Sequence, residues 1–225
     1  MTLIATNPIR SALSGAGLLV DTRGAIPEQV TSVEDDSRRV ARGSLFIAVK
    51  GSERDGHDFL GRAAEAGAAM AIVEDPKKTT LPSLVVREGR RAAAIAASAA
   101  YHWPARQLQI TGVTGTNGKT TTAHIIRHLL DGPKARAASI GTVGVLIGSE
   151  GTPFVEDTSL TTPGPVELQR LLRGLVDAGV RHVAMEVSSH ALHPQRVGGV
   201  GFDTAVFTNL SRDHLDYHRT MEGYR

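Results

Sequence analysis

A glycine-rich turn, TGTNGKTT, at positions 114–121 contains the residues of this chain that are best suited to chemistry. An apolar β-type run precedes this turn and a helix-type pattern follows it, which is the order found in a phosphate-binding loop. Gly115 and Gly118 would let the backbone approach phosphate groups, whose charge the turn's N–H groups and the helix N-terminus would hold. The Lys119 ammonium would reach the terminal phosphates, and the Thr120 hydroxyl would coordinate magnesium. The match to the general pattern is imperfect, and the alternative is a glycine-rich turn that binds no ligand.

Polar side chains follow two later strand-like runs. Glu186 lies at the end of the run VAMEV, where an unpaired buried charge is costly. It therefore either holds a cation, and oxygen ligands suit Mg²⁺, or caps a nearby helix. Asn209 ends the other run, where its amide either orients a nucleotide or caps a turn. His214 follows beside Asp213 and is either a ligand-facing side chain or a loop histidine bonded to that aspartate.

For other reactive side chains, the sequence supports a functional role less strongly. Ser188 and His190 could suggest a serine hydrolase, but no glycine-flanked nucleophile turn surrounds the serine. Histidine pairs at 190/193 and 214/218 could suggest a transition metal, but no thiolate or third ligand accompanies them, so solvated or substrate-facing histidines are expected. Arg196 suits a substrate carboxylate or phosphate, with an ordinary surface arginine as the alternative.

Two loops in the first half of the chain follow predicted strands, at residues 36–38 and 52–54. Their Asp, Ser, Glu and Arg side chains could bind a ligand. Turn chemistry alone also explains Asp, Ser and Gly at such positions.

The elements that must position these residues fall into two groups. In the first, the pattern predicts short helices at 9–13 and 60–67, strands around 30–33, 45–49, 68–74 and 83–86, and an alanine-rich helix over 88–103. Pro104 ends this group. We therefore expect a first domain at residues 1–104 and a second at 105–225.

In the second group, the pattern predicts strands around 108–113, 137–145, 183–187 and 204–210, an exposed hairpin or loop at 146–157, and a helix at 166–178. The helix after the glycine-rich turn is expected to place on one face the residues Ile125, Ile126, Leu129 and Leu130. Alternation of strands and helices predicts α/β domains with mostly parallel sheets. Ligands of such sheets gather at the carboxyl ends of the strands, which is where the motifs fall.

Composition limits the other classes of function. The 225 residues are 41% hydrophobic and 21% charged, which is ordinary for a globular protein. A net charge of +2 is too small to indicate binding to nucleic acid or to a membrane. The chain has no cysteine, which excludes disulfides, thiolate zinc sites and a cysteine nucleophile. Because no apolar run is long enough to span a bilayer, we expect a cytoplasmic location.

Four motifs, in this order, resemble those of one family: TGTNGKTT, SLTTPG, AMEVSSHAL and VFTNLSRDHLDYH. They are similar to the motifs of the Mur ligases of peptidoglycan synthesis, and within that family to the UDP-N-acetylmuramoyl-tripeptide synthetases (MurE type). The segment DSRRVARGSLFIAVKGSERDGHDF resembles the uridine-binding segment of the same enzymes. The resemblance spans about residues 30–225 and implies a small N-terminal domain that binds a UDP-linked substrate, followed by the first part of an ATP-binding domain.

The resemblance also implies a role for individual residues. The residues that would hold the UDP end of the substrate are Asp35, Ser37, Ser52, Glu53 and Arg54. Those that would hold ATP are Gly115, Thr116, Asn117, Gly118, Lys119, Thr120 and Thr121, together with Asn209. The muramoyl peptide would contact Thr161, Thr162, Ser188 and Arg196. Magnesium would be bound by Thr120, Glu186 and His214, and the expected catalytic residues are Lys119, Glu186 and His214.

The implied reaction is an ATP-dependent amide ligation. The D-glutamyl carboxylate of UDP-N-acetylmuramoyl-L-alanyl-D-glutamate takes the γ-phosphoryl group, and the amine of a diamino acid (meso-diaminopimelate or L-lysine) then displaces phosphate. Members of the family continue with a carbamylated lysine and a third domain beyond the equivalent of residue 225. We therefore expect this chain to be an N-terminal piece that binds substrate and does not catalyse ligation by itself. We separately expect it to be a monomer.

Three other functions stay open from the sequence. A folylpolyglutamate synthetase-like ligase would share the central domain, although the uridine-type segment argues against it. A non-catalytic nucleotide-sugar-binding module would keep the sites and lack the reaction. A general phosphate-loop ATPase would hydrolyse ATP whether or not a UDP-sugar is present.

Overall fold

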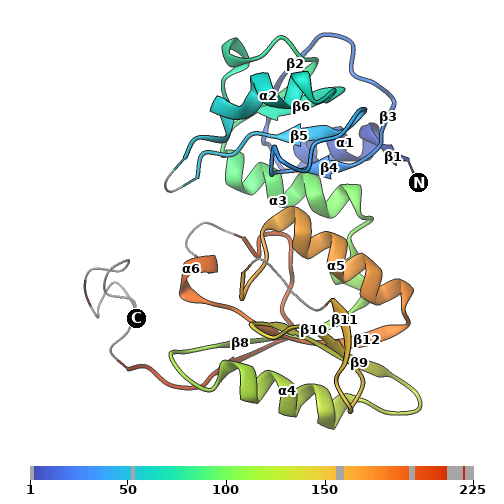
Figure 1. Cartoon of the computed structure of the whole chain (residues 1–225), viewed down its shortest axis with the longest axis vertical. Coiled ribbons are helices and arrows are strands. Elements are labelled where there is room, and N and C mark those ends of the chain that lie inside the picture. The colour runs from blue at the N-terminus through green and yellow to red at the C-terminus, as the bar shows by residue number, and fades with distance from the viewer. Residues whose placement is uncertain (1–2, 52–53, 156–159, 193–195, 212–219, 221–225) are drawn as a thin grey trace. The chain divides into compact units, whose positions relative to one another are not determined.

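The computed structural model describes residues 3–51, 54–155, 160–192, 196–211 and 220. The chain divides into two compact units, Met1–Trp103 and Pro104–Arg225. Each unit has its own sheet, covered by its own helices (Figure 1). The predicted α/β class with mostly parallel sheets is confirmed.

The first unit is built on a five-stranded sheet in the order β2-β7-β6-β5-β4. Its parallel strands are β4 (Val33–Glu34), β5 (Leu45–Ile47), β6 (Met70–Val73) and β7 (Ser83–Val86), and β2 (Leu19–Arg23) pairs antiparallel with β7. A small antiparallel pair joins β1 (Ile4–Ala5) to β3 (Gln29–Val30). The helical elements are α1 (Thr6–Gly15), η1 (Gly56–Phe59), α2 (Leu60–Glu65), η2 (Pro76–Lys78) and α3 (Gly89–Ala100).

The beginning of the chain differs from its prediction. The predicted helix at 9–13 is present and longer, but strand β2 follows it and has no counterpart in the prediction. At the edge of its sheet, β2 has half-buried and exposed residues and therefore lacks a strong apolar alternation. The run at 30–33, predicted as one strand, is two short strands in different sheets. The strands within 68–74 and 83–86 and the alanine-rich helix are confirmed.

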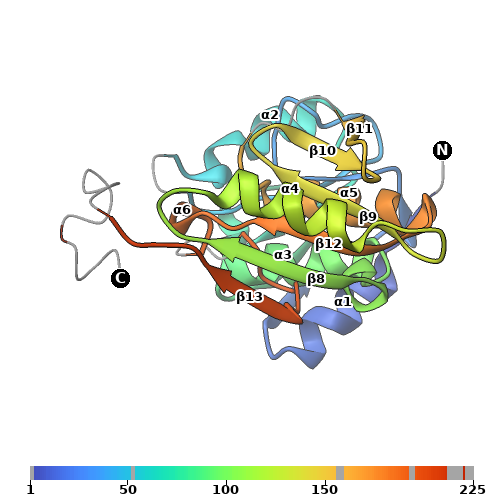
Figure 2. The ribbon, with the colours of Figure 1, turned by 90° about the horizontal axis from the view of Figure 1, so that it is seen from below.

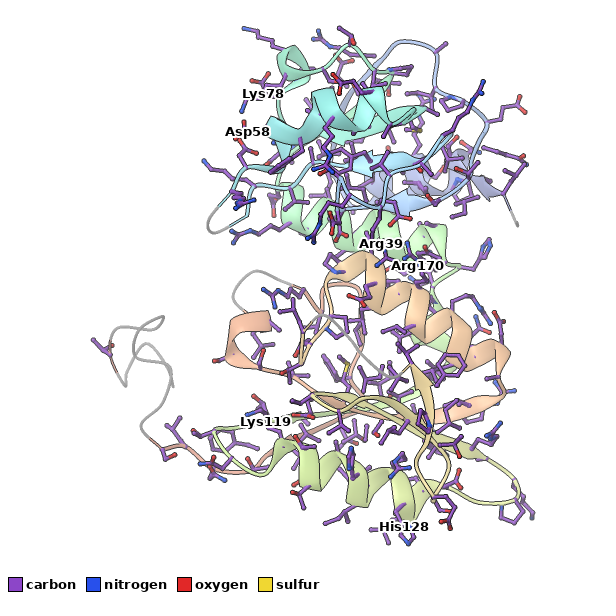
Figure 3. The ribbon with its side chains drawn as sticks, viewed as in Figure 1. Arg39, Asp58, Lys78, Lys119, His128 and Arg170 are labelled. Carbon is purple, nitrogen blue, oxygen red and sulfur yellow. The ribbon has the colours of Figure 1, made fainter. Side chains whose placement is uncertain are left out.

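The loop after β5 is fixed by a cluster of hydrogen bonds around Asp55. Its carboxylate accepts the His57 N–H at 3.0 Å, the His57 Nδ1–H at 2.7 Å and the Lys78 ammonium at 3.2 Å. The His57 ring is buried, and its Nε2 accepts the Glu74 N–H at 3.0 Å, so the ring proton lies on Nδ1. Lys78 also reaches Asp58, which lies beside it at the same edge of the unit (Figure 3). The backbone N–H of His57, followed by its ring, lowers the pKa of Asp55 from the ordinary value of 3.8.

We expect Asp55→Asn to destabilise the protein at neutral pH by about 1 kcal/mol, because it weakens charge-assisted hydrogen bonds. A carboxylate whose pKa is lower in the folded state stabilises that state above its unfolded pKa and loses the effect as the pH falls. The difference in free energy of unfolding between the wild type and Asp55→Asn should therefore shrink as the pH falls from about 5 to about 2. Urea unfolding followed by the fluorescence of Trp103, the only tryptophan, measures this difference. Asp58→Asn is the matched control, and a difference independent of pH would contradict the assignment.

The second unit contains a six-stranded sheet in the order β11-β10-β9-β12-β8-β13. The parallel strands are β8 (Gln109–Thr114), β9 (Arg136–Gly141), β12 (Val180–Glu186) and β13 (Thr204–Phe207). Strands β10 (Gly144–Ile147) and β11 (Thr152–Val155) extend the sheet as an antiparallel hairpin. Helix α4 (Lys119–Leu130) lies along one face of this sheet and α5 (Pro165–Asp177) along the other, as Figures 1 and 2 show. Two short elements, η3 (Pro104–Gln107) and α6 (Ser189–Leu192), complete the unit.

The two faces of this sheet are packed differently. On the α5 side, Leu168, Leu172 and Leu175 pack among the apolar residues of β8, β9 and β12. On the α4 side the buried cluster is small and aliphatic, built on Val113, Ala123 and Ala184. The predicted helix at 166–178 and strand at 183–187 are confirmed, each within a few residues.

The face that α4 presents to the sheet is not the predicted one. Ile125, Leu129 and Leu130 are 53%, 73% and 42% exposed, and Ile126 is only partly buried. The buried positions are Ala123 and Arg127. The small alanine permits close approach to the strands, and a long arginine stem can cover apolar surface, so these residues take the core-facing side.

The strand predicted at 137–145 is also corrected. β9 ends at Gly141, a turn of two residues follows, and β10 begins at Gly144 with a φ of +94°. The predicted hairpin is present, formed by β10 and β11. None of the helices in the described part of the chain is long and apolar enough to cross a membrane.

Candidate functional site

The carboxyl ends of three parallel strands meet at one edge of the second unit. Glu186 at the end of β12 is in register with Val113 of β8, and Phe207 of β13 is in register with Thr114. The glycine-rich turn leaves the sheet at this edge and leads into α4. Lys119, the first residue of that helix, lies beside these strand ends (Figure 3). Topology therefore gathers the motifs at the edge where α/β sheets bind ligands.

The turn has the backbone shape of an anion-binding loop. Gly115 has a φ of +127° and Gly118 a φ of +83°, which side-chain-bearing residues rarely adopt. The N-terminus of α4 then points its free N–H groups into the loop. The Lys119 ammonium donates to the carbonyl oxygens of Gly115 at 2.7 Å and Thr116 at 2.9 Å. The cation is thus held over the loop.

A cavity of about 620 Å³ opens in front of the loop. It is lined by Thr116, Asn117, Gly118, Lys119, Thr120, Thr142, Leu160, Thr161, Thr162, Glu186, Ser188 and Arg196. Ten of the residues singled out from the sequence are among these twelve. The structure therefore brings together the loop, the carboxylate and the residues expected to contact the peptide.

Glu186 presents a buried carboxylate to this cavity. The residue is 2% exposed; its Oε1 accepts the Thr142 N–H at 2.9 Å, and its Oε2 lies 3.3 Å from the Thr142 hydroxyl. No Lys or Arg side chain of the described residues forms an ion pair with it. A buried carboxylate without a cationic partner, among threonine hydroxyls, is an oxygen-rich environment that fits Mg²⁺. Among the described residues, no three His, Asp or Glu side chains come together, so the loop hydroxyl, phosphate oxygens and water would complete the ligand set.

Threonine hydroxyls connect this carboxylate to the rest of the cavity. Thr162 Oγ1 donates to the Glu186 carbonyl oxygen at 3.0 Å and accepts the Ser188 N–H at 3.1 Å. Thr161 Oγ1 lies 3.2 Å from the hydroxyl of Thr142. Glu186 therefore belongs to one hydrogen-bonded network with Thr142, Thr161, Thr162 and Ser188.

Thr142 is the residue that sequence reasoning missed. It follows the end of β9 in the same way that the other site residues follow their strands. Because the pattern predicts one unbroken strand over 137–145, it places Thr142 inside a strand and not after the end of one.

Arg196 supplies positive charge to the cavity, whereas His124 lies in the neighbouring groove along α4. The Arg196 guanidinium lines the cavity and has no ion-pair partner among the described residues, so it is available to an anionic group. Burial, followed by the charge of Arg127, lowers the pKa of His124, while Glu186 acts in the opposite direction. The surroundings of His124 therefore favour the neutral form of its imidazole.

The remaining predicted residues of this unit lie elsewhere or outside the described part. Gly115, Thr121 and Asn209 do not line the cavity; Thr121 lines a neighbouring groove along α4, and Asn209 lies against the back of the loop. His214 lies outside the described residues, as do Ser52 and Glu53 of the first unit.

In the first unit, the predicted residues follow two adjacent parallel strands. Asp35 and Ser37 come after β4, and Arg54 comes in the loop after β5, so both loops leave the same edge of that sheet. Asp35 and Arg54 are exposed and Ser37 is half-buried. The turn between Asp35 and Ser37 is fixed by Asp36, whose carboxylate binds Arg38; that side-chain bond is the main cause of the lowered pKa of Asp36.

Two family models cover most of the chain. Residues 113–225 match the Mur ligase middle domain, and residues 29–114 match the catalytic domain of the Mur ligase family. The chain belongs to the Mur ligase family. The resemblance of the four motifs is thereby confirmed.

Curated relatives in the Mur ligase family are similar over most of this chain. A UDP-N-acetylmuramoyl-L-alanyl-D-glutamate–2,6-diaminopimelate ligase of Geobacillus thermodenitrificans is 51% identical over 203 residues, which are 90% of this chain and 40% of that protein. The ligase of the same name from Geobacter sulfurreducens is 43% identical over 207 residues, again covering 40% of its length. This chain thus spans about 40% of the length of the relatives that it matches.

Solved structures of Mur ligases have the same fold. A UDP-N-acetylmuramoyl-L-alanyl-D-glutamate–2,6-diaminopimelate ligase superposes on 99% of this chain with a TM-score of 0.77 and 28% identity, and the match covers 43% of that ligase. MurF from Acinetobacter baumannii superposes with a TM-score of 0.67 at 21% identity, covering 99% of this chain and 44% of MurF. The second likeness concerns the fold alone.

Proposed function

We propose that this chain is the part of a MurE-type ligase that holds ATP and the UDP-linked substrate. The whole enzyme would add a diamino acid to UDP-N-acetylmuramoyl-L-alanyl-D-glutamate during peptidoglycan precursor synthesis. The names of the relatives at 51% and 43% identity support diaminopimelate as the amino acid added. A cytoplasmic location and a monomeric state stay predictions.

The observation that carries this proposal is the shared cavity of the second unit. Residues of the phosphate loop, the buried Glu186 carboxylate and the Arg196 side chain all line it. A ligase that activates a carboxylate with ATP must hold both reactants within reach of each other. A general phosphate-loop ATPase does not need the residues on the peptide side.

Each side of the cavity has a role in the proposed ligation. Lys119 and the loop N–H groups would hold the β- and γ-phosphates, and a magnesium ion on Thr120 and Glu186 would neutralise phosphate charge when bound. Arg196, Thr161, Thr162 and Ser188 would orient the peptide, so that its glutamyl carboxylate oxygen attacks the γ-phosphorus and ADP leaves.

The second half of the ligation releases phosphate. The amine of the diamino acid attacks the carbonyl carbon of the acyl phosphate, loses a proton and displaces inorganic phosphate. The fixed donors around the cavity lower the barriers by holding charge that develops in these steps. This activity is proposed for a protein with the full length of the relatives.

The binding half of the proposal can be tested on this chain by calorimetric titration with UDP-N-acetylmuramoyl-L-alanyl-D-glutamate. We expect saturable binding, weakened about tenfold by Ser37→Ala through loss of a hydrogen bond to the charged UDP end. Ser14→Ala, at an exposed position of α1, is the control and should bind like the wild type. Competition by a folate substrate, or equal affinity of Ser37→Ala and the wild type, would count against the UDP-binding assignment.

A further inference from the structure

A segment of the second unit, Thr208–Ser211, lies against the back of the phosphate loop. It follows β13 directly and is more than ninety positions away from the loop in sequence. We call this segment the brace. Its hydrogen bonds reach Thr114 at the end of β8, and Thr116 and Asn117, which lie between the two loop glycines.

Asn209 makes the most specific of these contacts. Its Nδ2 donates to the Asn117 carbonyl oxygen at 2.9 Å, and its Oδ1 accepts the Asn117 N–H at 3.1 Å. The Asn209 backbone carbonyl accepts the Thr116 N–H at 2.9 Å. One residue of the brace therefore fixes the backbone of two consecutive residues of the loop.

The other brace residues support the same two loop positions. The Thr208 hydroxyl donates to the Asn117 carbonyl oxygen at 2.7 Å. The Ser211 N–H donates to Thr116 Oγ1 at 3.0 Å, and Thr116 Oγ1 lies 3.2 Å from the Ser211 carbonyl oxygen. Both ends of the brace are thus bonded to the loop.

The brace also sits close to the loop sterically. A Cβ at Gly115 would overlap the Thr208 hydroxyl and come within 2.8 Å of the Asn209 carbonyl oxygen. Glycine at this position is therefore what permits the close approach. The Lys119 ammonium also donates hydrogen bonds to the carbonyl oxygens of Gly115 and Thr116. The loop is therefore held by Lys119 as well as by the brace.

We propose that Asn209 is a positioning residue that sets the conformation of the phosphate loop, rather than one that recognises the nucleoside. Both polar atoms of its amide bind the backbone of Asn117, and the residue does not line the ligand cavity. By holding the peptide groups of Thr116 and Asn117 in place, it keeps the loop ready for a polyphosphate. This inference rests on the proposed nucleotide binding.

The first test compares Mg-ATP with magnesium tripolyphosphate, which has the phosphates and no nucleoside. Calorimetric titrations are made on the wild type, Asn209→Ala and Thr208→Val. We expect each variant to bind both ligands about tenfold more weakly, by the same factor, because hydrogen bonds that shape the loop are lost. Thr204→Val, the same change at an exposed position of β13, should bind like the wild type. A loss confined to ATP would show that Asn209 contacts the nucleoside and would overturn the proposal, as would wild-type affinity for both.

A second measurement needs no ligand. In hydrogen exchange followed residue by residue, the Thr116 and Asn117 amides should exchange about tenfold faster in Asn209→Ala than in the wild type, since the acceptor of the Asn117 N–H is removed. Unchanged exchange at these amides in a folded variant would overturn the proposal. If the wild type binds neither ligand, the proposed nucleotide binding fails, and the exchange rates still decide whether the brace shapes the loop. If Asn209→Ala does not fold, Asn209→Ser, whose shorter side chain also lacks the amide, serves the same comparison.

Discussion

Gly141→Ala is expected to remove most of the magnesium dependence of ATP binding, although residue 141 carries no functional side chain. A Cβ there would overlap Oε1 of Glu186 and come within 2.6 Å of its Cδ. The carboxylate cannot stay in place, because Gly141 and Glu186 occupy neighbouring strands and Thr142 holds the carboxylate from the end of β9. Moving it breaks the hydrogen bond to the Thr142 N–H and displaces the proposed metal ligand. We expect Mg-ATP affinity to fall on the order of 10- to 100-fold, the effect of losing one interaction with a charged group.

The measurement is a titration with ATP in the presence of Mg²⁺ and again with a chelator. The wild type should lose affinity when the metal is removed, whereas Gly141→Ala should bind ATP weakly in both conditions. Gly132→Ala is the matched control, because a Cβ at that glycine meets no atom within 4 Å and its backbone is not in the left-handed region. If Gly141→Ala kept the magnesium dependence of the wild type, Glu186 would not be the carboxylate that binds the metal.

The same glycine illustrates what the sequence could and could not predict. The phosphate loop was predictable because its residues are consecutive and lie between a strand and a helix. Glu186 stood out as a charge at the end of an apolar strand. The partners of Glu186 could not be predicted, because its contact with Gly141 and Thr142 depends on how β9 pairs with β12. These two strands are some forty positions apart in the sequence. Local periodicity carries no information about such pairing.

Helix α4 shows a second limit of the sequence. Its apolar residues favour a core face that includes Ile125 and Leu129, and both are exposed. The sheet beneath the helix accepts Ala123 and the stem of Arg127 instead, whose guanidinium reaches the Gly148 carbonyl oxygen in the β10–β11 turn. Periodicity predicted that a helix is present; which face it buries was decided by the shape of the surface it covers.

Lys119→Met is expected to weaken Mg-ATP binding on the order of 100-fold. The variant keeps the length and apolar character of the side chain and removes the charge. In the structure the ammonium does two things: it crosslinks the carbonyl oxygens of Gly115 and Thr116, and it places a positive charge at the glycine-rich loop. Losing the ammonium removes charge-assisted hydrogen bonds to the phosphates, which contribute roughly 1.5–3 kcal/mol to binding. It also removes the two hydrogen bonds that hold the loop carbonyl groups in place.

The salt dependence of binding separates these two effects. An ammonium that contacts phosphate makes wild-type affinity fall as salt rises, and the Lys119→Met variant should respond less to salt because the charge is gone. Lys134→Met, an exposed lysine in the same unit, is the control for a general change in net charge and should retain wild-type affinity. If Lys119→Met bound Mg-ATP as tightly as Lys134→Met, the ammonium would serve only to shape the loop, and the helix N-terminus and metal alone would hold the phosphates.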